Sequence, residues 1–256
     1  AFFLKDKNPQ MSEDELLKRL HLSNALMFFS RGTPVIYYGD EQGFVGDGGD
    51  GDSRQDMMPS FVDSYNDDDL IGTDATTAVA NFDQTHPIYT ELAALANVYQ
   101  SHEALRSGVQ HLRYASDSDN MLAISRVIPE DGVDYLILFN LGSNEHILSL
   151  DTAASSYEAI VEAKSFAQRK DTLEITLPGL SYAIYKSKTQ VPAIEKPMFN
   201  IANYELSGDE FPRVSITYDS PTIDKYPVAN LKLTTELLDE HNQWQLVSFD
   251  EQPPYT

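Results

Sequence analysis

A short apolar run near the start of the chain constrains the fold most. Residues 33–38 (TPVIYY) do not alternate polar with apolar side chains, and such a run predicts a strand buried on both faces, as in parallel sheets covered by helices. Pro34 suits the first position of a strand, where a missing N–H is tolerated. The run opens directly onto residues 39–41 (GDE). We therefore expect an α/β unit whose functional residues follow the strand.

Helices are predicted on both sides of this run. Residues 12–15 (SEDE) form a capping box before an apolar face, which predicts a helix over 12–30 with Gly32 at its end. Residues 85–87 (THP) predict the start of a second helix that ends near Ser101. Between the strand and this helix, residues 39–83 form a long acidic loop, a kind of segment that is usually functional.

From Gly108 the sequence changes to short apolar segments separated by turns, which is typical of an antiparallel β-sandwich. The predicted strands lie near 109–115, 121–127, 133–140, 144–150, 157–162, 172–177 and 181–187. A polar segment with two prolines, residues 187–197, is predicted to be a linker. Alternation at 214–218 and 231–234 predicts another β module, in which the single tryptophan, Trp244, is expected in the core.

These patterns predict four parts: 1–107 as the end of an α/β domain, 108–187 as a β-sandwich, 188–197 as a linker, and 198–256 as a partial β module. The chain begins AFFL without an initiator Met and stops at residues 253–256 (PPYT) without a closing strand. We therefore expect both ends to be cut from a longer protein.

Composition excludes several classes of partner. The 18 Lys and Arg residues are outnumbered by 40 Asp and Glu residues, which gives a net charge of −22. This charge repels nucleic-acid phosphates and anionic membrane surfaces, so we expect neither as a partner. The absence of cysteine excludes disulfides and thiolate metal sites. No apolar run reaches the roughly 18 to 20 residues of a membrane span.

Four segments resemble the α-amylase family of glycoside hydrolases. Residues 32–41 (GTPVIYYGDE) resemble the motif of its eighth barrel strand, and residues 50–59 (DGDSRQDMMP) are similar to the loop after that strand. Residues 102–108 (HEALRSG) resemble the passage from barrel to sandwich, although Glu103 stands where proline is usual. Residues 177–181 (LPGLS) resemble the final strands of the sandwich. The resemblance covers about residues 1–187, with the motifs in the family's order.

The resemblance implies the last αβα elements of a (β/α)8 barrel followed by an antiparallel sandwich. The family cleaves or transfers α-glucosidic bonds with retention, using three carboxylates at the ends of the fourth, fifth and seventh strands. All three would precede Ala1, so the resemblance implies no catalytic residue in this chain, and we expect the chain alone to be inactive. The intact parent is then expected to be an α-1,4-glucan hydrolase, monomeric, and extracellular or periplasmic.

The resemblance also implies a substrate-binding set of Asp50, Arg54, Glu41 and Tyr37. Asp50 and Arg54 match the family pair that holds a sugar on the non-reducing side of the cleavage point, with acceptors on one and a fork of donors on the other. Plainer interpretations stay open. The pair could be a solvated salt bridge worth about 0 to 1 kcal/mol, Glu41 a buried structural acid, and Tyr37 a packing residue.

Other functions and a metal were also weighed. Asp47, Asp50 and Asp52 resemble a calcium loop, but their spacing fails the EF-hand pattern. We expect no cofactor within this chain and allow calcium in the parent. Alternatives are a transglycosylase or debranching relative, a non-catalytic carbohydrate-binding or partner subunit, and an α/β scaffold without sugar function. Because one strand cannot close a barrel, the helix over 12–30 is expected to expose Leu16, Leu20, Phe28 and Phe29.

Overall fold

The computed structural model describes residues 8–46, 49–192, 200–207, 213–219, 228 and 233–250. Asp47, residues 193–197 of the predicted linker, residues 231–232 and both chain ends lie outside the described residues. Within this described part, no helix is long and apolar enough to cross a membrane.

Both predicted helices are confirmed. Helix α2 spans Glu13–Phe29, and the Ser12 hydroxyl accepts the Glu15 N–H at 3.3 Å at its N-terminus. It ends at an extended Ser30 rather than at Gly32. Helix α3 spans Pro87–Ser101 with proline in its first turn, and a short helix α4, Glu103–Ser107, follows it.

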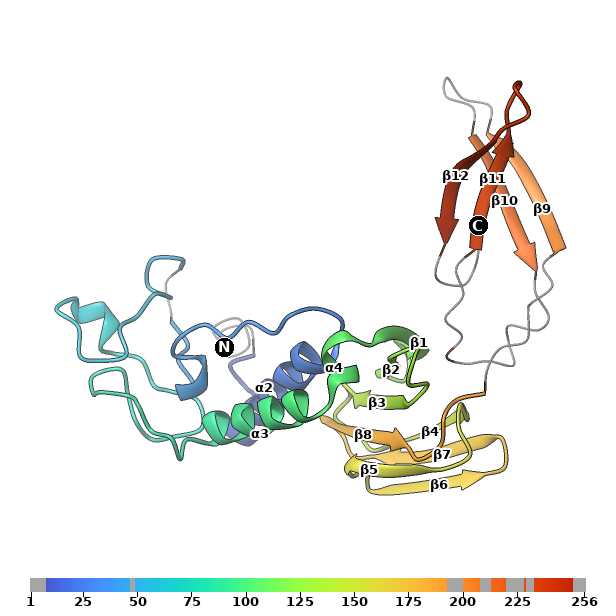
Figure 1. The fold of residues 1–256 in the computed structure, drawn as a ribbon. Coiled ribbons are helices and arrows are strands. Elements are labelled where there is room, and N and C mark those ends of the chain that lie inside the picture. Colours follow the sequence, from blue (N-terminus) through green and yellow to red (C-terminus); the bar gives the residue numbers. More distant parts are fainter. Residues whose placement is uncertain are drawn as a thin grey trace.

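The strands of residues 109–187 form two antiparallel sheets (Figure 1). The order in the five-stranded sheet is β1-β2-β3-β8-β5, and in the three-stranded sheet β4-β7-β6. The prediction gave seven of these strands and missed β6. Their bounds are β1 Val109–Ser116, β2 Met121–Val127, β3 Asp134–Asn140, β4 His146–Asp151, β5 Tyr157–Val161, β6 Ser165–Arg169, β7 Thr172–Leu177 and β8 Ser181–Ser187.

Two separate antiparallel hairpins follow. One joins β9 Asn200–Ser207 to β10 Arg213–Asp219, and the other joins β11 Leu233–Leu238 to β12 Trp244–Asp250. The predicted segments at 214–218 and 231–234 fall on β10 and at the start of β11. Trp244 is 66% exposed, so its expected place in a core is wrong. A two-stranded hairpin has no inner layer in which to bury a side chain of that size.

The two sheets of the 109–187 region pack face to face. Side chains that alternate along β2, β3 and β8 meet those of β4 and β7 in one apolar cluster. Its buried members are Met121, Ala123, Leu136, Leu138, Leu148, Leu150, Leu173, Ile175, Leu177, Ala183 and Tyr185. This arrangement is the predicted antiparallel sandwich.

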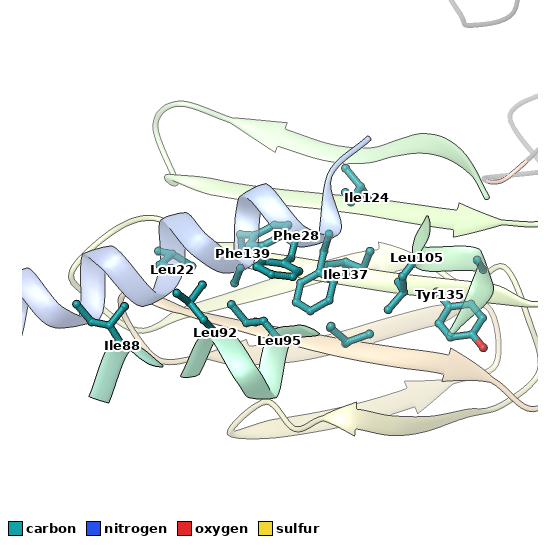
Figure 2. Close-up of a cluster of buried hydrophobic side chains, with 14 residues drawn as sticks. Leu22, Phe28, Ile88, Leu92, Leu95, Leu105, Ile124, Tyr135, Ile137 and Phe139 are labelled. Carbon is teal, nitrogen blue, oxygen red and sulfur yellow. The ribbon is translucent and has the colours of Figure 1, made fainter. Parts of the chain in front are cut away.

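Helices α2, α3 and α4 cover the other face of the five-stranded sheet. Figure 2 shows Phe28, Leu92 and Leu95 lying over Ile137 and Phe139 of β3. Phe28 is 4% exposed and Phe29 is fully buried, and Leu16 lies in a smaller buried cluster. The expectation of an exposed helix face is therefore wrong. The outer face of β3 and β8 supplies the apolar surface for Phe28 and Phe29, and Val45 and Ile71 of the loop supply it for Leu16.

The predicted strand at residues 33–38 is also wrong. Residues 33–37 belong to no helix or strand, and Val35 is 76% exposed. A strand needs a neighbour to satisfy its backbone groups, and none of the described segments pairs with this one. All strand pairs of the two sheets and both hairpins are antiparallel, so the described residues contain antiparallel sheets and few helices, without a parallel α/β unit.

Candidate functional site

The acids after the apolar run lie in a tight turn bounded by two glycines. Residues Asp40–Gln42 form one turn of 3-10 helix between Gly39, at φ +91°, and Gly43, at φ +74°. Both φ values lie in the left-handed region, which favours glycine. A Cβ at Gly43 would also lie 2.2 Å from the carbonyl oxygen of Ile71. The spacing of the two glycines thus follows from the geometry of the turn.

Gln42 ties this turn to the far end of the long loop. Its side-chain amide donates to the Asp83 carbonyl at 3.0 Å, and its carbonyl oxygen accepts the Asp83 N–H at 2.9 Å. The side chain is 2% exposed. This reciprocal pair closes the loop of residues 39–83 at its base. Sequence reasoning missed Gln42, because nothing in the local pattern distinguishes it from the acids beside it.

Asp50 and Arg54 form an ion pair on the surface of the loop. The guanidinium Nη2 donates to the Asp50 carboxylate at 2.8 Å. Their side chains are 89% and 63% exposed, respectively. The backbone holds the two residues one turn apart, since Ser53 N–H donates to Gly49 O and Arg54 N–H to Gly51 O. An exposed pair of this kind contributes little to stability, so both groups remain available to a ligand.

The tyrosines of the apolar run lie beside this pair. The Tyr37 and Tyr38 rings pack in a tilted arrangement, with centroids 4.4 Å apart and an interplanar angle of 34°, and each residue is about half exposed. The Tyr38 hydroxyl reaches the backbone carbonyl of Arg54 at 3.4 Å. Its interaction with Tyr37, a hydrogen bond first of all, raises the pKa of Tyr38 above its usual value. The structure therefore links Tyr37, through Tyr38, to Arg54 and Asp50.

Glu41 takes a different position. Its carboxylate accepts the N–H of Gly39 at 2.9 Å, while Asp40 accepts the N–H of Tyr37 at 3.2 Å. Both acids thus hold the backbone of the turn. Of the four predicted residues, the structure joins Asp50 directly to Arg54 and links Tyr37 to Arg54 only through Tyr38, whereas Glu41 has a local backbone contact instead.

A buried polar cluster shapes the rest of the loop. Gln55 donates to the Asp68 carboxylate at 2.5 Å, and Thr77, which is fully buried, pairs with the backbone of Asp68. The Asn66 side chain makes two hydrogen bonds with the backbone of Ser60. Sequence analysis missed the role of Gln55. Hydrogen-bonded polar groups therefore give this acidic loop an interior.

The described residues contain no group of three or more His, Asp or Glu side chains placed to hold a metal ion. Asp47 of the calcium-like segment lies outside them.

Comparison with known proteins adds an independent observation. No protein-family model matches the chain. An α-amylase from Streptomyces lividans is 41% identical over 197 residues, which cover 75% of this chain and 21% of that protein. The chain thus spans about a fifth of the length of this curated relative.

Solved structures agree on the fold. An α-amylase from Geobacillus thermoleovorans, solved in complex with acarbose, superposes with a TM-score of 0.54 at 19% identity, covering 74% of this chain and 37% of that one. An Anoxybacillus α-amylase gives a TM-score of 0.51 at 20% identity, covering 69% and 34%. Because the 41% identity to the Streptomyces protein extends over three quarters of this chain, the chain belongs to the α-amylase family of glycoside hydrolases.

Proposed function

We propose that this chain is the C-terminal part of a retaining α-glucan hydrolase acting on α-1,4-glucosidic bonds. In this proposal residues 1–107 end a (β/α)8 barrel, 108–187 form its C-terminal sandwich, 188–197 are a linker, and 198–256 belong to a further β module. The catalytic acids lie in a segment that precedes the chain. The 41% identity to an α-amylase supports the proposal.

The apolar run at residues 33–38 is consistent with a barrel strand without its neighbours. Val35 is 76% and Ile36 43% exposed, although such side chains are usually buried. The strands of a parallel barrel are buried on both faces and carry runs of this composition. Strands on either side, from the preceding segment, would cover these side chains and form backbone hydrogen bonds with the run.

The Asp50–Arg54 pair carries the assignment of a sugar-binding site. A carboxylate supplies acceptors and a guanidinium supplies a planar fork of donors, so the pair can grip two adjacent hydroxyl groups of one sugar ring. Tyr37 and Tyr38 lie next to the pair and offer half-exposed aromatic rings, which can pack against the apolar face of a sugar. Glu41 stabilises the turn next to this surface, because its carboxylate accepts the N–H of Gly39.

In the protein that includes the preceding segment, we expect Asp50→Asn and Arg54→Met each to weaken binding of maltoheptaose by about tenfold to a hundredfold. A hydrogen bond to a charged group is worth about 1.5 to 3 kcal/mol, and each substitution removes one charged partner. Titration calorimetry measures the affinity when the catalytic acids of the preceding segment are also substituted, so that maltoheptaose is bound but not cleaved. The melting temperature should change little, because the pair is exposed.

A second surface ion pair provides a matched control. Asp14 and Lys18 also lie four residues apart, with a distance of 2.6 Å and exposed side chains. Asp14→Asn and Lys18→Met should leave the affinity for maltoheptaose unchanged. Equal losses at both pairs would show that Asp50 and Arg54 hold no sugar.

The isolated chain is expected not to hydrolyse soluble starch, whereas the protein with the preceding segment should do so. Release of reducing ends measures both. Starch cleavage by the 256-residue chain alone would overturn the placement of the catalytic acids outside it. Calcium binding, a monomeric parent and export from the cell remain predictions of the same proposal.

A further inference from the structure

Helices α2 and α3 meet along a seam that is apolar at one end and polar at the other. At the C-terminal end, Phe28 and Tyr99 pack edge to face with ring centroids 5.8 Å apart, next to the buried side chains that Figure 2 shows over β3. At the N-terminal end, titratable side chains enter the seam. They are His21 of α2, His86 at the start of α3, and Glu91 of α3.

Four polar atoms of these residues are shielded from water without a hydrogen-bond partner. They are Nε2 of His21, Nε2 of His86, and both carboxylate oxygens of Glu91. The Ile71 backbone lies beside His86 and the Asn24 side chain beside Glu91, but neither reaches normal hydrogen-bond geometry. Buried polar groups are normally paired, and an unpaired charge in such a place is far more costly than an unpaired neutral group. The geometry therefore favours the neutral form of each residue.

The position of His86 fixes its neutral form in a second way. Its Nδ1 accepts the N–H of Ile88 at 3.2 Å and so caps helix α3. An imidazolium carries a proton on both nitrogens and cannot accept this bond. Protonation of His86 thus removes the cap of α3 and places a charge where the residue is only 3% exposed.

The pKa shifts of the three residues also favour their neutral forms. Burial, followed by repulsion from His86, lowers the pKa of His21. Burial lowers the pKa of His86 also, and Asp83, the Ile71 backbone and Glu41 only partly offset it. Burial raises the pKa of Glu91 from 4.5 to about 8, and the side chain of Asn24 on α2 lowers it by a smaller amount. Tyr182 of β8 lies near Glu91, and burial first, with the charge of Glu91 second, raises the pKa of Tyr182 to about 12.

We propose that this seam is a pH-dependent clasp, in which α2 and α3 stay docked on the five-stranded sheet only while His21, His86 and Glu91 are all uncharged. The clasp joins the helices before and after the candidate sugar-binding loop, because residues 30–86 connect α2 to α3. Undocking of α2 and α3 from the sheet would therefore free the two helices that anchor the ends of that loop.

The two kinds of residue act in opposite directions. The contribution of Glu91 to docking is full below its pKa of 4.5 in the opened state and is lost as the pH rises towards about 8. The contribution of the histidines is present above 6.5 and is lost as the pH falls below that value. Docking is therefore expected to be tightest near about pH 6 to 6.5, with the opening constant changing by up to about tenfold per pH unit for each group that titrates.

Amide hydrogen exchange of the full chain, followed by NMR from pH 5 to pH 9, tests the clasp. After correction for intrinsic exchange, the opening constant of α2 and α3 amides should rise on both sides of the optimum. Amides of β7 are the internal reference, since Leu173 and Ile175 lie between the two sheets. Glu91→Gln should abolish the alkaline rise. His21→Asn combined with His86→Ser should abolish the acid rise, since serine can still cap α3.

Direct titration of Glu91 keeps the test independent of how the variants fold. The carboxyl ¹³C shift of Glu91 in the unmodified chain should titrate near pH 8. A midpoint below pH 6, or an α2 and α3 profile that follows β7 at every pH, would overturn the proposal. So would an alkaline rise that persists unchanged in Glu91→Gln.

Discussion

Replacing Arg126 by methionine is expected to lower the free energy of unfolding of the chain by about 3 to 5 kcal/mol. Arg126 lies in β2 and is 2% exposed. Its guanidinium donates to the carbonyls of Gly108 at 3.0 Å, Arg106 at 3.3 Å and Phe29 at 3.4 Å. Methionine keeps the length and apolar stem of the side chain but leaves these three carbonyls without that donor.

The position of these carbonyls explains why the effect is large. Phe29 is the last residue of α2, and Arg106 lies in the last turn of α4. Helix C-termini carry free carbonyls and a partial negative charge, so one buried cation serves the ends of two helices and binds them to the sheet. Burial lowers the pKa of Arg126, but a guanidinium still remains protonated at neutral pH.

Urea unfolding followed by far-ultraviolet circular dichroism measures this loss. Arg126→Lys should recover only part of it, because one ammonium group cannot reach all three carbonyls in the same geometry. Arg169→Met is the matched control on the sheet surface: its side chain is 77% exposed beside Glu174, so the expected change is below about 0.5 kcal/mol. A change of less than about 1 kcal/mol for Arg126→Met would contradict the role assigned to the guanidinium.

Elements whose signals are local could be predicted from the sequence. The capping serine of α2, the proline of α3 and the apolar segment of β3 each act over a few residues, and all three elements are where the patterns placed them. β6 was missed because Ser165–Arg169 is polar or only half-buried along its length, so it lacks the alternation on which strand prediction depends.

Features that depend on distant partners could not be predicted in the same way. Residues 33–38 have the composition of a buried strand, yet composition cannot supply the neighbouring strands that would pair with them. Conversely, Phe28 and Phe29 were expected to be exposed, and they are buried because β3 presents an apolar outer face. The candidate site shows the same limit, since a tilted ring contact joins Tyr37 to Tyr38 and the Tyr38 hydroxyl reaches the Arg54 backbone, contacts that no spacing predicts.

A second large effect is expected at the buried ion pair between Arg113 and Asp134. Their side chains are 2% and 0% exposed, and Nη1 lies 3.3 Å from the Asp134 carboxylate. The same carboxylate oxygen accepts the Tyr157 hydroxyl at 2.8 Å, and Arg113 also donates to Ser125 at 2.8 Å and to the Asp151 carbonyl. Asp151 ends β4, so Arg113 joins the five-stranded sheet to the three-stranded one.

Arg113→Met should therefore cost about 3 to 5 kcal/mol, because it leaves the Asp134 carboxylate buried without a cation. Asp134→Leu should cost a similar amount, since it leaves the buried guanidinium without an anion and the Tyr157 hydroxyl without an acceptor. The double variant should be more stable than the sum of the two losses predicts by at least about 2 kcal/mol, because two apolar side chains of similar volume leave no buried charge.

The double-mutant cycle also separates this pair from simple packing. If the two side chains only filled space between the sheets, their coupling energy should stay well below the roughly 2 kcal/mol expected for the ion pair. Tyr157→Phe, which removes one donor to Asp134 and no charge, should cost only about 1 to 2 kcal/mol. Urea denaturation of the unmodified chain, Arg113→Met, Asp134→Leu and the double variant gives the coupling energy. An additive cycle would mean that the charges do not hold the sheets together, and that the apolar cluster between β3 and β7 alone does so.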